Sequence, residues 1–313
     1  MSTNLATLPA VSNPKAHKGM LRTIFGSMLR DPKSATGLTI FVIFILMAAL
    51  APLLAPYNPD AATFAQTQAP SAAHWLGTTA MGQDVFSQFL FGARTTLMVG
   101  IGAGLLSTIL ALLVGLTAGY RRGWLDSILN TISNVFLVMP GLALLIVIES
   151  LVKNASPLTN GLIIGLTGWA WGARVFRAQT MSLSNRDFIV AAKLSGASDI
   201  RIMITEIAPN MMSIIAANVM YASLGAILAE SGLAFLGLEN VQQISWGTML
   251  YWASQGSATL TGAWWWFVPP GLGIALVGLS LVLMNFAIDQ ITNPRLRVEK
   301  RRKNRANTKP SRA

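Results

Sequence analysis

The sequence predicts an all-α membrane protein with six membrane-spanning helices. Only 11% of the 313 residues are charged and 53% are hydrophobic, whereas a typical soluble domain has about 25% charged residues. The apolar residues also lie in long unbroken runs, which the short strands of a soluble core do not need. Too few charged residues remain to cover a soluble protein of this length. The lipid bilayer is therefore the expected solvent.

Each predicted span is an apolar stretch long enough to cross the bilayer, which takes about 20 residues for about 30 Å of hydrocarbon. The six stretches are approximately 36–55, 95–120, 127–148, 154–173, 209–232 and 267–288. A cleavable signal has a short basic lead and an apolar core of about 7–15 residues. The first stretch begins only near residue 36 and continues to about residue 55, so we expect a retained helix.

Lysine and arginine gather at the two ends of the chain. Nine of the 23 basic residues lie in 295–312 and five more lie in 15–33. Basic clusters beside apolar segments are what orient a membrane protein. We therefore expect the basic residues behind the net charge of +11 to orient the protein in the membrane and not to bind nucleic acid.

The loops between the predicted spans show the same asymmetry. Basic residues lie in the turn 121–122 and in the loop 174–206, whereas the segments 57–93 and 239–267 contain none. Lys153 disagrees with this pattern, but one charge does not outweigh the others. Because basic loops stay on the cytoplasmic side, both termini are expected in the cytoplasm.

The sequence contains no recognisable catalytic or metal-binding motif. Cysteine is absent, which excludes disulfides, thiolate metal sites and cysteine nucleophiles. The two histidines, His17 and His74, are too few for a histidine-rich metal cluster, and each is expected in a loop or at an interface. The patterns GxxxxGK[ST], HExxH and GxSxG are missing. An enzyme would have to be assembled from scattered acidic residues, so we expect no enzyme activity.

The two long outer segments are expected to be more than plain loops. Segment 57–93 begins with the turn signal Asn58-Pro59-Asp60. Segment 241–266 is uncharged and rich in tryptophan, namely Trp246, Trp252, Trp264, Trp265 and Trp266. Indole rings favour the level of the lipid headgroups, which predicts an aromatic belt and an interfacial helix.

Glycines spaced four residues apart recur in the second and fourth predicted spans. The pairs are Gly115/Gly119, Gly161/Gly165 and Gly168/Gly172. In lipid this spacing lets two helix backbones approach closely. We therefore expect these helices to pack on protein, within the bundle or against a partner subunit.

The cytoplasmic loop between the fourth and fifth predicted spans is longer than a connection requires. Its sequence, RAQTMSLSNRDFIVAAKLSGASDIRIMITEIAPN, predicts two short amphipathic helices joined at Gly196. The pair Ala191–Ala192 offers a flat surface on which another protein could sit closely. The alternative interpretation is a helix that lies on the lipid surface.

This loop carries a resemblance to a known family. The run Val190-Ala191-Ala192-x-x-x-Gly196, followed by Ile207-Ala208-Pro209, resembles the EAA loop of ABC importer permeases. In that family the loop is the coupling helix that sits in a groove of the ATP-binding subunit. The resemblance implies an ATPase-coupling loop that includes Arg186, Asp187, Ala191, Ala192, Gly196, Ala197 and Pro209.

A larger part of the chain, about residues 29–297, is similar to the C-type subunit of the dipeptide/oligopeptide/nickel permeases. The similar pieces occur in the family's order: LRDP at 29–32, LLAPYNP at 53–59, HWLGT at 74–78, GQD at 82–84, GAR at 92–94, ESGLAFLGL at 230–238, SWGTML at 245–250 and NPRLR at 293–297. Three positions depart from the pattern. Val190 replaces the usual glutamate, VQQI at 241–244 replaces the usual prolines, and GAWWW at 262–266 differs from typical peptide-type subunits.

The resemblance implies a multi-subunit importer in the cytoplasmic (inner) membrane of a prokaryote. Its partners would be a homologous second permease subunit, two cytoplasmic ATP-binding subunits, an extracytoplasmic solute-binding protein and membrane lipid. ATP would be bound by the partner subunits, so this chain would need no cofactor. The expected organisation is a cytoplasmic tail (1–35), a first span (36–56), an extracytoplasmic segment (57–93), a permease core (94–290) with five spans and the coupling loop 177–208, and a basic cytoplasmic tail (291–313).

The resemblance makes oligopeptides or dipeptides the expected solute, with oligosaccharides or nickel as alternatives. Glu230, Trp246 and Trp252 are candidate contacts in the translocation path or outer segment. A neutral, tryptophan-rich segment would suit sugar stacking, whereas nickel would need imidazole or carboxylate ligands. A more distant alternative is an ion-coupled secondary transporter, which would place ionisable groups near the bilayer midplane. The acidic residues at span level, Glu149, Glu230 and Asp289, lie near helix ends instead.

Overall fold

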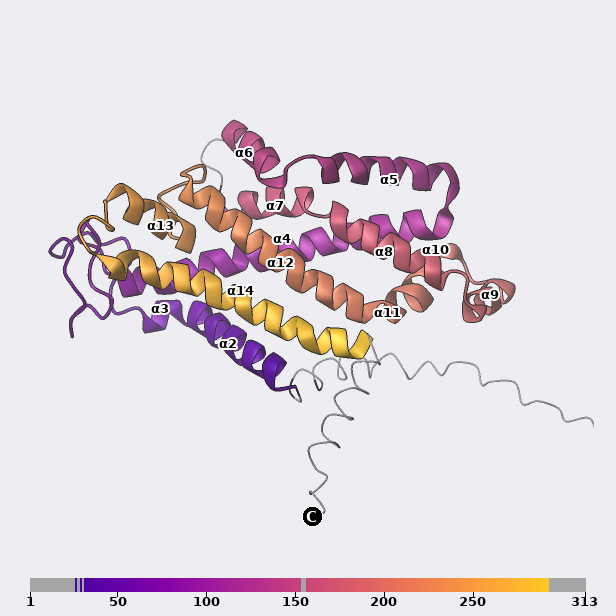
Figure 1. The fold of residues 1–313 in the computed structure, drawn as a ribbon, viewed down its shortest axis with the longest axis horizontal. Helices are drawn as coiled ribbons and strands as arrows, with labels where there is room; N and C mark the ends of the chain where they lie inside the picture. The colour runs from indigo at the N-terminus through magenta and orange to yellow at the C-terminus, as the bar shows by residue number, and fades with distance from the viewer. Residues whose placement is uncertain (1–25, 27–28, 30, 153–155, 293–313) are drawn as a thin grey trace, which may run out of the picture.

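A computed structural model describes residues 26, 29, 31–152 and 156–292, and these are almost entirely helical (Figure 1). The β-structure in this part of the chain is an isolated antiparallel bridge between Thr78 and Asp84. The predictions for the two basic tails, His17 and Lys153 lie outside the described residues. The described helices confirm the all-α class.

The first predicted span corresponds to α2 (Pro32–Ala49) and α3 (Ala51–Leu54). Asp31 caps α2, and Pro32 occupies the first turn, where the missing N–H costs nothing. α2 packs along α14 (Trp264–Thr292). At Gly37 an added Cβ would lie 2.7 Å from the carbonyl oxygen of Ser280, so the two helices touch backbone to backbone.

α4 (Val85–Arg121) is the central helix of the bundle and packs against α7, α8 and α12. It begins about ten residues before the predicted span because Asp84 caps it, accepting from the Ser87 N–H at 2.8 Å. Gly115 and Gly119 lie against α8, and Gly165 lies against α4. The structure thus confirms that these glycines permit close helix packing.

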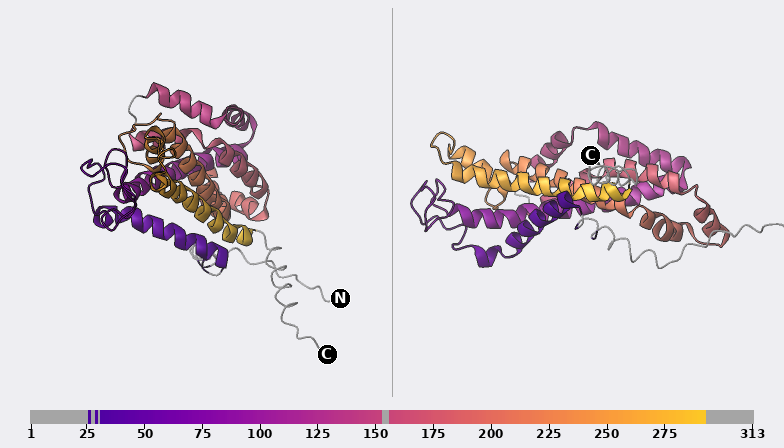
Figure 2. Two further views of the ribbon diagram at one scale, coloured as in Figure 1. Left: turned by 60° about the vertical axis from the view of Figure 1, so that its left-hand side comes forward. Right: turned by 60° about the horizontal axis from the view of Figure 1, so that its bottom comes forward.

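The third predicted span is not one helix. α5 (Gly123–Val138) and α6 (Gly141–Leu151) meet at a bend of 88°. Pro140 lies at this bend; proline has no N–H to donate and disfavours helical backbone at the residue before it. Figure 2 shows both helices at the periphery of the bundle.

The fourth predicted span is also divided. α7 (Pro157–Thr167) ends at Gly168, and α8 (Ala170–Leu183) continues well beyond the predicted boundary. α8 is tied to α5 by the guanidinium group of Arg177, which binds the carboxylate of Asp126 at 2.5 and 2.7 Å. The predicted uninterrupted helix over 154–173 is therefore replaced by two helices joined at Gly168 and Trp169.

The remaining predicted spans correspond to α12 (Met212–Phe235) and α14, with α13 (Trp246–Gln255) between them. Among the described residues, four helices are long and apolar enough to cross a membrane: α2, α4, α12 and α14. The bent α5–α6 pair makes a fifth if it counts as one span. The chain is a multi-pass membrane protein, and six spans remain a prediction.

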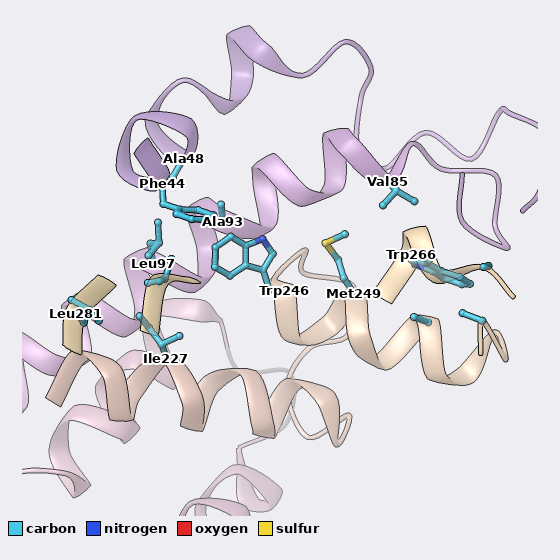
Figure 3. Close-up of a cluster of buried hydrophobic side chains, with 14 residues drawn as sticks. Phe44, Ala48, Val85, Ala93, Leu97, Ile227, Trp246, Met249, Trp266 and Leu281 are labelled. Carbon is cyan, nitrogen blue, oxygen red and sulfur yellow. The ribbon is translucent and has the colours of Figure 1, made fainter. Parts of the chain in front are cut away.

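A large hydrophobic cluster joins α2, α4, α12, α13 and α14 around Trp246 (Figure 3). The Trp246 ring meets Phe44 edge-on at 5.6 Å and stacks on Phe89 at 5.5 Å between ring centroids. Its indole N–H donates to the Phe89 carbonyl at 3.0 Å. Burial of such a ring stabilises the fold most where its N–H is satisfied, as here.

The two ends of the bundle differ in structure (Figure 1). The segment 57–84 and α13 lie at one end, while α9 (Asp187–Leu194) projects at the other. The start of α2 and the end of α14 lie towards the α9 side of the molecule. Helices that run between these ends carry the two sites described next.

Candidate functional site: a coupling segment and a central cavity

The coupling segment comprises α9, α10 (Asp199–Arg201), the π-helical turn η2 (Ile202–Ile207) and α11 (Ala208–Asn210), which leads into α12. The break predicted at Gly196 is present, and Gly196 has a φ of +79°. Glycine adopts this left-handed conformation without the cost that a Cβ imposes. Ser198 then caps α10 by accepting from the Arg201 N–H at 3.4 Å.

The π-helical turn lies just before Pro209. Proline has no N–H to donate to the carbonyl of the preceding turn, and π-type turns are found mainly where a helix is locally disturbed, often at functional sites. The side-chain amide of Asn210 donates to the carbonyl of Glu206, within this turn, at 2.5 Å. Pro209 itself is half-buried and joins the segment to the base of α12.

One side of the coupling segment is anchored in the bundle. Ile189, Ile202 and Ile207 are fully buried in a cluster with α4, α8 and Met211. Ala192 and Ala197 are half-buried and pack against the same cluster. The predicted Ala191–Ala192 surface is therefore divided, because Ala192 faces the bundle and Ala191 is exposed.

The opposite side is exposed and apolar. Its large members are Val190, Leu194, Ile200 and Ile204, with exposed fractions of 49%, 85%, 60% and 61%. Arg186 and Asp187, at the start of α9, are exposed beside them. We call Val190, Ala191, Leu194, Ile200 and Ile204 the coupling face. Large apolar side chains that gather on a surface mark a protein or membrane contact.

The end of α4 holds the coupling segment by polar contacts that the sequence did not reveal. The Tyr120 hydroxyl donates to Asp199 at 3.3 Å, and Arg121 pairs with the same carboxylate at 3.8 Å. The Lys193 ammonium lies 4.9 Å from the centre of the Tyr120 ring. In the sequence, Arg121 indicated only the orientation of the chain in the membrane. The structure shows that it also links the coupling segment to the central helix.

The outer segment is fastened by a buried pair. His74 Nδ1 lies 2.8 Å from Asp84 Oδ1, and the His74 ring packs against Tyr57 and Phe64. Asp84 also caps α4, so one carboxylate joins the outer segment to the central helix. The structure confirms the loop position expected for His74. It also shows that the pair and the ring contacts hold this segment in place, which the turn signals alone did not predict.

The aromatic-belt interpretation is wrong for Trp246 and Trp266, which are 0% and 2% exposed. Trp246 is a core residue of the described chain, and its role as a contact in the translocation path or outer segment stays a prediction. Trp252 is half-buried, and its indole N–H donates to the Val241 carbonyl at 2.9 Å. It borders a small outer pocket of about 240 Å³ and stays a candidate contact.

Glu230 is completely buried in α12, near the C-terminal end of the helix. Its Oε2 accepts from the Ser231 hydroxyl at 3.0 Å, and the hydroxyls of Thr96 and Ser245 face the same carboxyl group. The structure therefore places Glu230 within the bundle and not in the outer segment.

A cavity of about 320 Å³ is lined by residues of α4, α5, α6, α7, α8 and α12. Small residues make much of its wall, including Gly141, Gly168, Gly172 and Gly225. Its polar groups are uncharged: Ser107, Thr167, Asn218 and Tyr221. The side-chain amide of Asn218, on α12, donates to the Thr108 hydroxyl at 2.9 Å, which joins α12 to α4. The wall of this cavity is therefore uncharged and mostly apolar.

Comparison with known proteins relates these features to one family. The model for the binding-protein-dependent transport system inner membrane component matches residues 111–298, and that for the N-terminal TM domain of oligopeptide transport permease C matches residues 20–73. The oligopeptide transport system permease protein OppC of Mycobacterium tuberculosis is 34% identical over 266 residues, 83% of this chain and 89% of that protein.

Two further relatives are named dipeptide transport system permease protein DppC. That of Bacillus subtilis is 34% identical over 274 residues, 86% of this chain and 83% of the relative. That of Alkalihalophilus pseudofirmus is 32% identical over 287 residues, 88% of this chain and 90% of the relative. The family match covers the coupling segment and every cavity-lining residue except Ala103 and Ser107. The chain belongs to the family of binding-protein-dependent transport system inner membrane components.

Proposed function

We propose that this chain is one of the two membrane-spanning subunits of an ATP-driven importer for oligopeptides or dipeptides in the cytoplasmic membrane of a prokaryote. The observation that carries the proposal is the coupling segment, with one side anchored in the bundle and the other exposed and apolar. The names of the relatives supply the solute class. The partners would be a second permease subunit, two ATPase subunits and an extracytoplasmic solute-binding protein.

The contacts of the coupling segment support a mechanical role. ATP binding would close the ATPase pair and displace the coupling face. Tyr120 and Arg121 connect Asp199 in that segment to α4, and α4 packs against α7, α8 and α12. Movement of the segment would therefore reach the helices that line the cavity. The bend at Pro140 and the joint at Gly168 are places where the cavity wall could change shape.

The proposal is tested by reconstitution. The sequence has no phosphate cradle, so the purified chain alone should neither bind nor hydrolyse ATP. Proteoliposomes that contain the chain, its permease partner and both ATPases should take up a tripeptide when ATP and the solute-binding protein are supplied. Sustained ATP hydrolysis by this chain without the other subunits would contradict the assignment, and so would uptake that does not depend on ATP.

The orientation of the chain is tested separately with single cysteines, because the native protein has none. Ser71 and Ser257 are exposed at the end proposed to lie outside. Ser71→Cys and Ser257→Cys should react with an impermeant thiol reagent in intact cells, whereas Ser311→Cys should react only after the membrane is opened. The reverse pattern would show that the basic tails are extracytoplasmic.

A further inference from the structure

A cleft of about 800 Å³ lies at the proposed outer end of the bundle. Four separate parts of the chain line it: the segment 52–60, the outer part of α4, the start of α7 and the loop 242–244 before α13. Pockets that hold small ligands have volumes of about 300–1,000 Å³, so the cleft is large enough for a short peptide. The α4 residues that line it are spaced three and four apart and therefore share one face of the helix: Phe91, Arg94, Thr95 and Met98.

Among the described residues that line this cleft, Arg94 carries the single positive charge. Its side chain is exposed and forms no hydrogen bond or ion pair with the described part of the chain. Asp60 is the acidic residue of the lining, and its carboxylate is not paired with Arg94. The guanidinium group of Arg94 is therefore available to an anion that enters the cleft.

The position of Arg94 separates it from the basic residues that orient the chain. Arg94 lies in the outer third of α4. The other described lysines and arginines lie at the start of α2, at the end of α4, in α8 or around the coupling segment. A positive charge on the outer side opposes the orientation that those residues favour. Ionisable side chains within spans are rare and often mark the path of a substrate, which gives Arg94 a different role.

The cleft also offers neutral hydrogen-bonding groups. The side chains of Gln242 and Gln243 are exposed, and their amide groups form no hydrogen bond within the described ranges. A side-chain amide has both donors and an acceptor, and the backbone amides of a peptide need both. The two glutamines and Arg94 therefore complement a chain of amides that ends in a negative charge.

A carboxylate matches a guanidinium group especially well, because two parallel N–H donors can bind its two oxygens. We propose that this cleft receives the peptide solute with its terminal carboxylate at Arg94 and its backbone amides at Gln242 and Gln243. These are groups that all linear peptides share, so the cleft would accept peptides with different side chains. This inference rests on the proposed function and names the part of the solute that this chain recognises.

The experiment combines one change in the protein with one change in the peptide. The purified complete transporter, without its solute-binding protein, is equilibrated with radiolabelled trialanine or with trialanine amide, which lacks the carboxylate. The wild type should bind trialanine about tenfold more tightly than the amide, because the amide cannot form the charge-assisted pair of hydrogen bonds. Arg94→Gln should weaken trialanine binding about tenfold and should not weaken binding of the amide. Retained binding of the amide also shows that the variant is folded.

Arg174→Gln is the matched control, because Arg174 is an exposed arginine of α8 that forms no ion pair in the described ranges and does not line the cleft. It should leave the binding of both peptides unchanged. Equal losses for trialanine and its amide in Arg94→Gln would overturn the inference, since Arg94 would then hold a lipid phosphate or support the fold. Trialanine binding that Arg94→Gln does not change, or no saturable binding to the wild type, would also overturn it.

The proposed function is checked in parallel by ATP-driven uptake of trialanine into wild-type proteoliposomes supplied with the solute-binding protein. Uptake together with any of these contrary binding results would refute the role of Arg94 and leave the importer assignment intact. Absence of uptake would count against the importer assignment itself.

Discussion

Replacing Gly104 by valine should destabilise the bundle more than any other single change that we consider. Gly104 lies where α4 crosses α12, and a Cβ at this position would lie 2.5 Å from the backbone nitrogen of Ser223 and 2.6 Å from its Cα. Cβ atoms in real proteins do not approach backbone atoms this closely. The obstacle is main chain, so no side-chain rotation relieves it. α12 would have to move away from α4.

The expected cost is large because both helices are central. Overpacking of this kind costs about 1–3 kcal/mol, and displacement of α12 would also disturb the hydrogen bond between Asn218 and Thr108. We expect Gly104→Val to lower the thermal unfolding midpoint in detergent by several degrees. Gly104→Ala should show a smaller shift in the same direction. The measurement is the loss of the monodisperse peak in size-exclusion chromatography after heating.

Gly102 provides the control on the same helix. A Cβ at Gly102 would meet no atom within 4 Å in this chain. Gly102→Val carries the same change in volume and the same loss of backbone freedom, so it isolates the effect of the α4–α12 contact. Equal midpoints for the two valine variants would show that the helices are not packed as closely as the structure indicates.

The sequence predicted the class of fold well because that prediction needs only composition. A run of about 20 apolar residues is a sufficient signal for a span, and α2, α4, α12 and α14 each overlap a predicted stretch. The predicted continuity of the third and fourth stretches was less reliable. Pro140 was visible in the sequence, but prolines are tolerated within membrane helices, so a bend of 88° could not be inferred from its presence.

The outer tryptophans show a second limit. Composition places tryptophan at the headgroup level, but whether a ring faces lipid or protein depends on residues far away in sequence. Trp246 is enclosed by Phe44 and Phe89, from two other helices.

The coupling segment was predicted in position and in its break, but not in the direction of its side chains. The break at Gly196 could be predicted because it depends only on that glycine and on the apolar pattern of the short helices on either side of it. The α9 helix is only eight residues long, which is too short for periodicity to fix which alanine faces outward. The structure decides this, because Ala192 packs on the bundle and Ala191 is exposed. Neighbouring alanines therefore make a matched pair for testing the ATPase contact.

Ala191→Arg should abolish retention of the ATPases while leaving the chain itself stable. The side chain of Ala191 is exposed in the isolated chain, so arginine there disturbs no internal contact. In a tight interface it would add bulk and an unpaired charge, and these together cost several kcal/mol. Co-purification of the ATPases should fall at least tenfold, and uptake should be lost.

Ala192→Arg should behave differently, because Ala192 packs against the cluster that anchors the coupling segment. Arginine at this position should lower the unfolding midpoint of the chain itself. If the coupling face lies instead on anionic lipid, an arginine at position 191 should be tolerated or favourable. Full retention of the ATPases and wild-type uptake with Ala191→Arg, while Ala192→Arg still lowers the midpoint, would therefore assign this face to the membrane surface and refute the docking role.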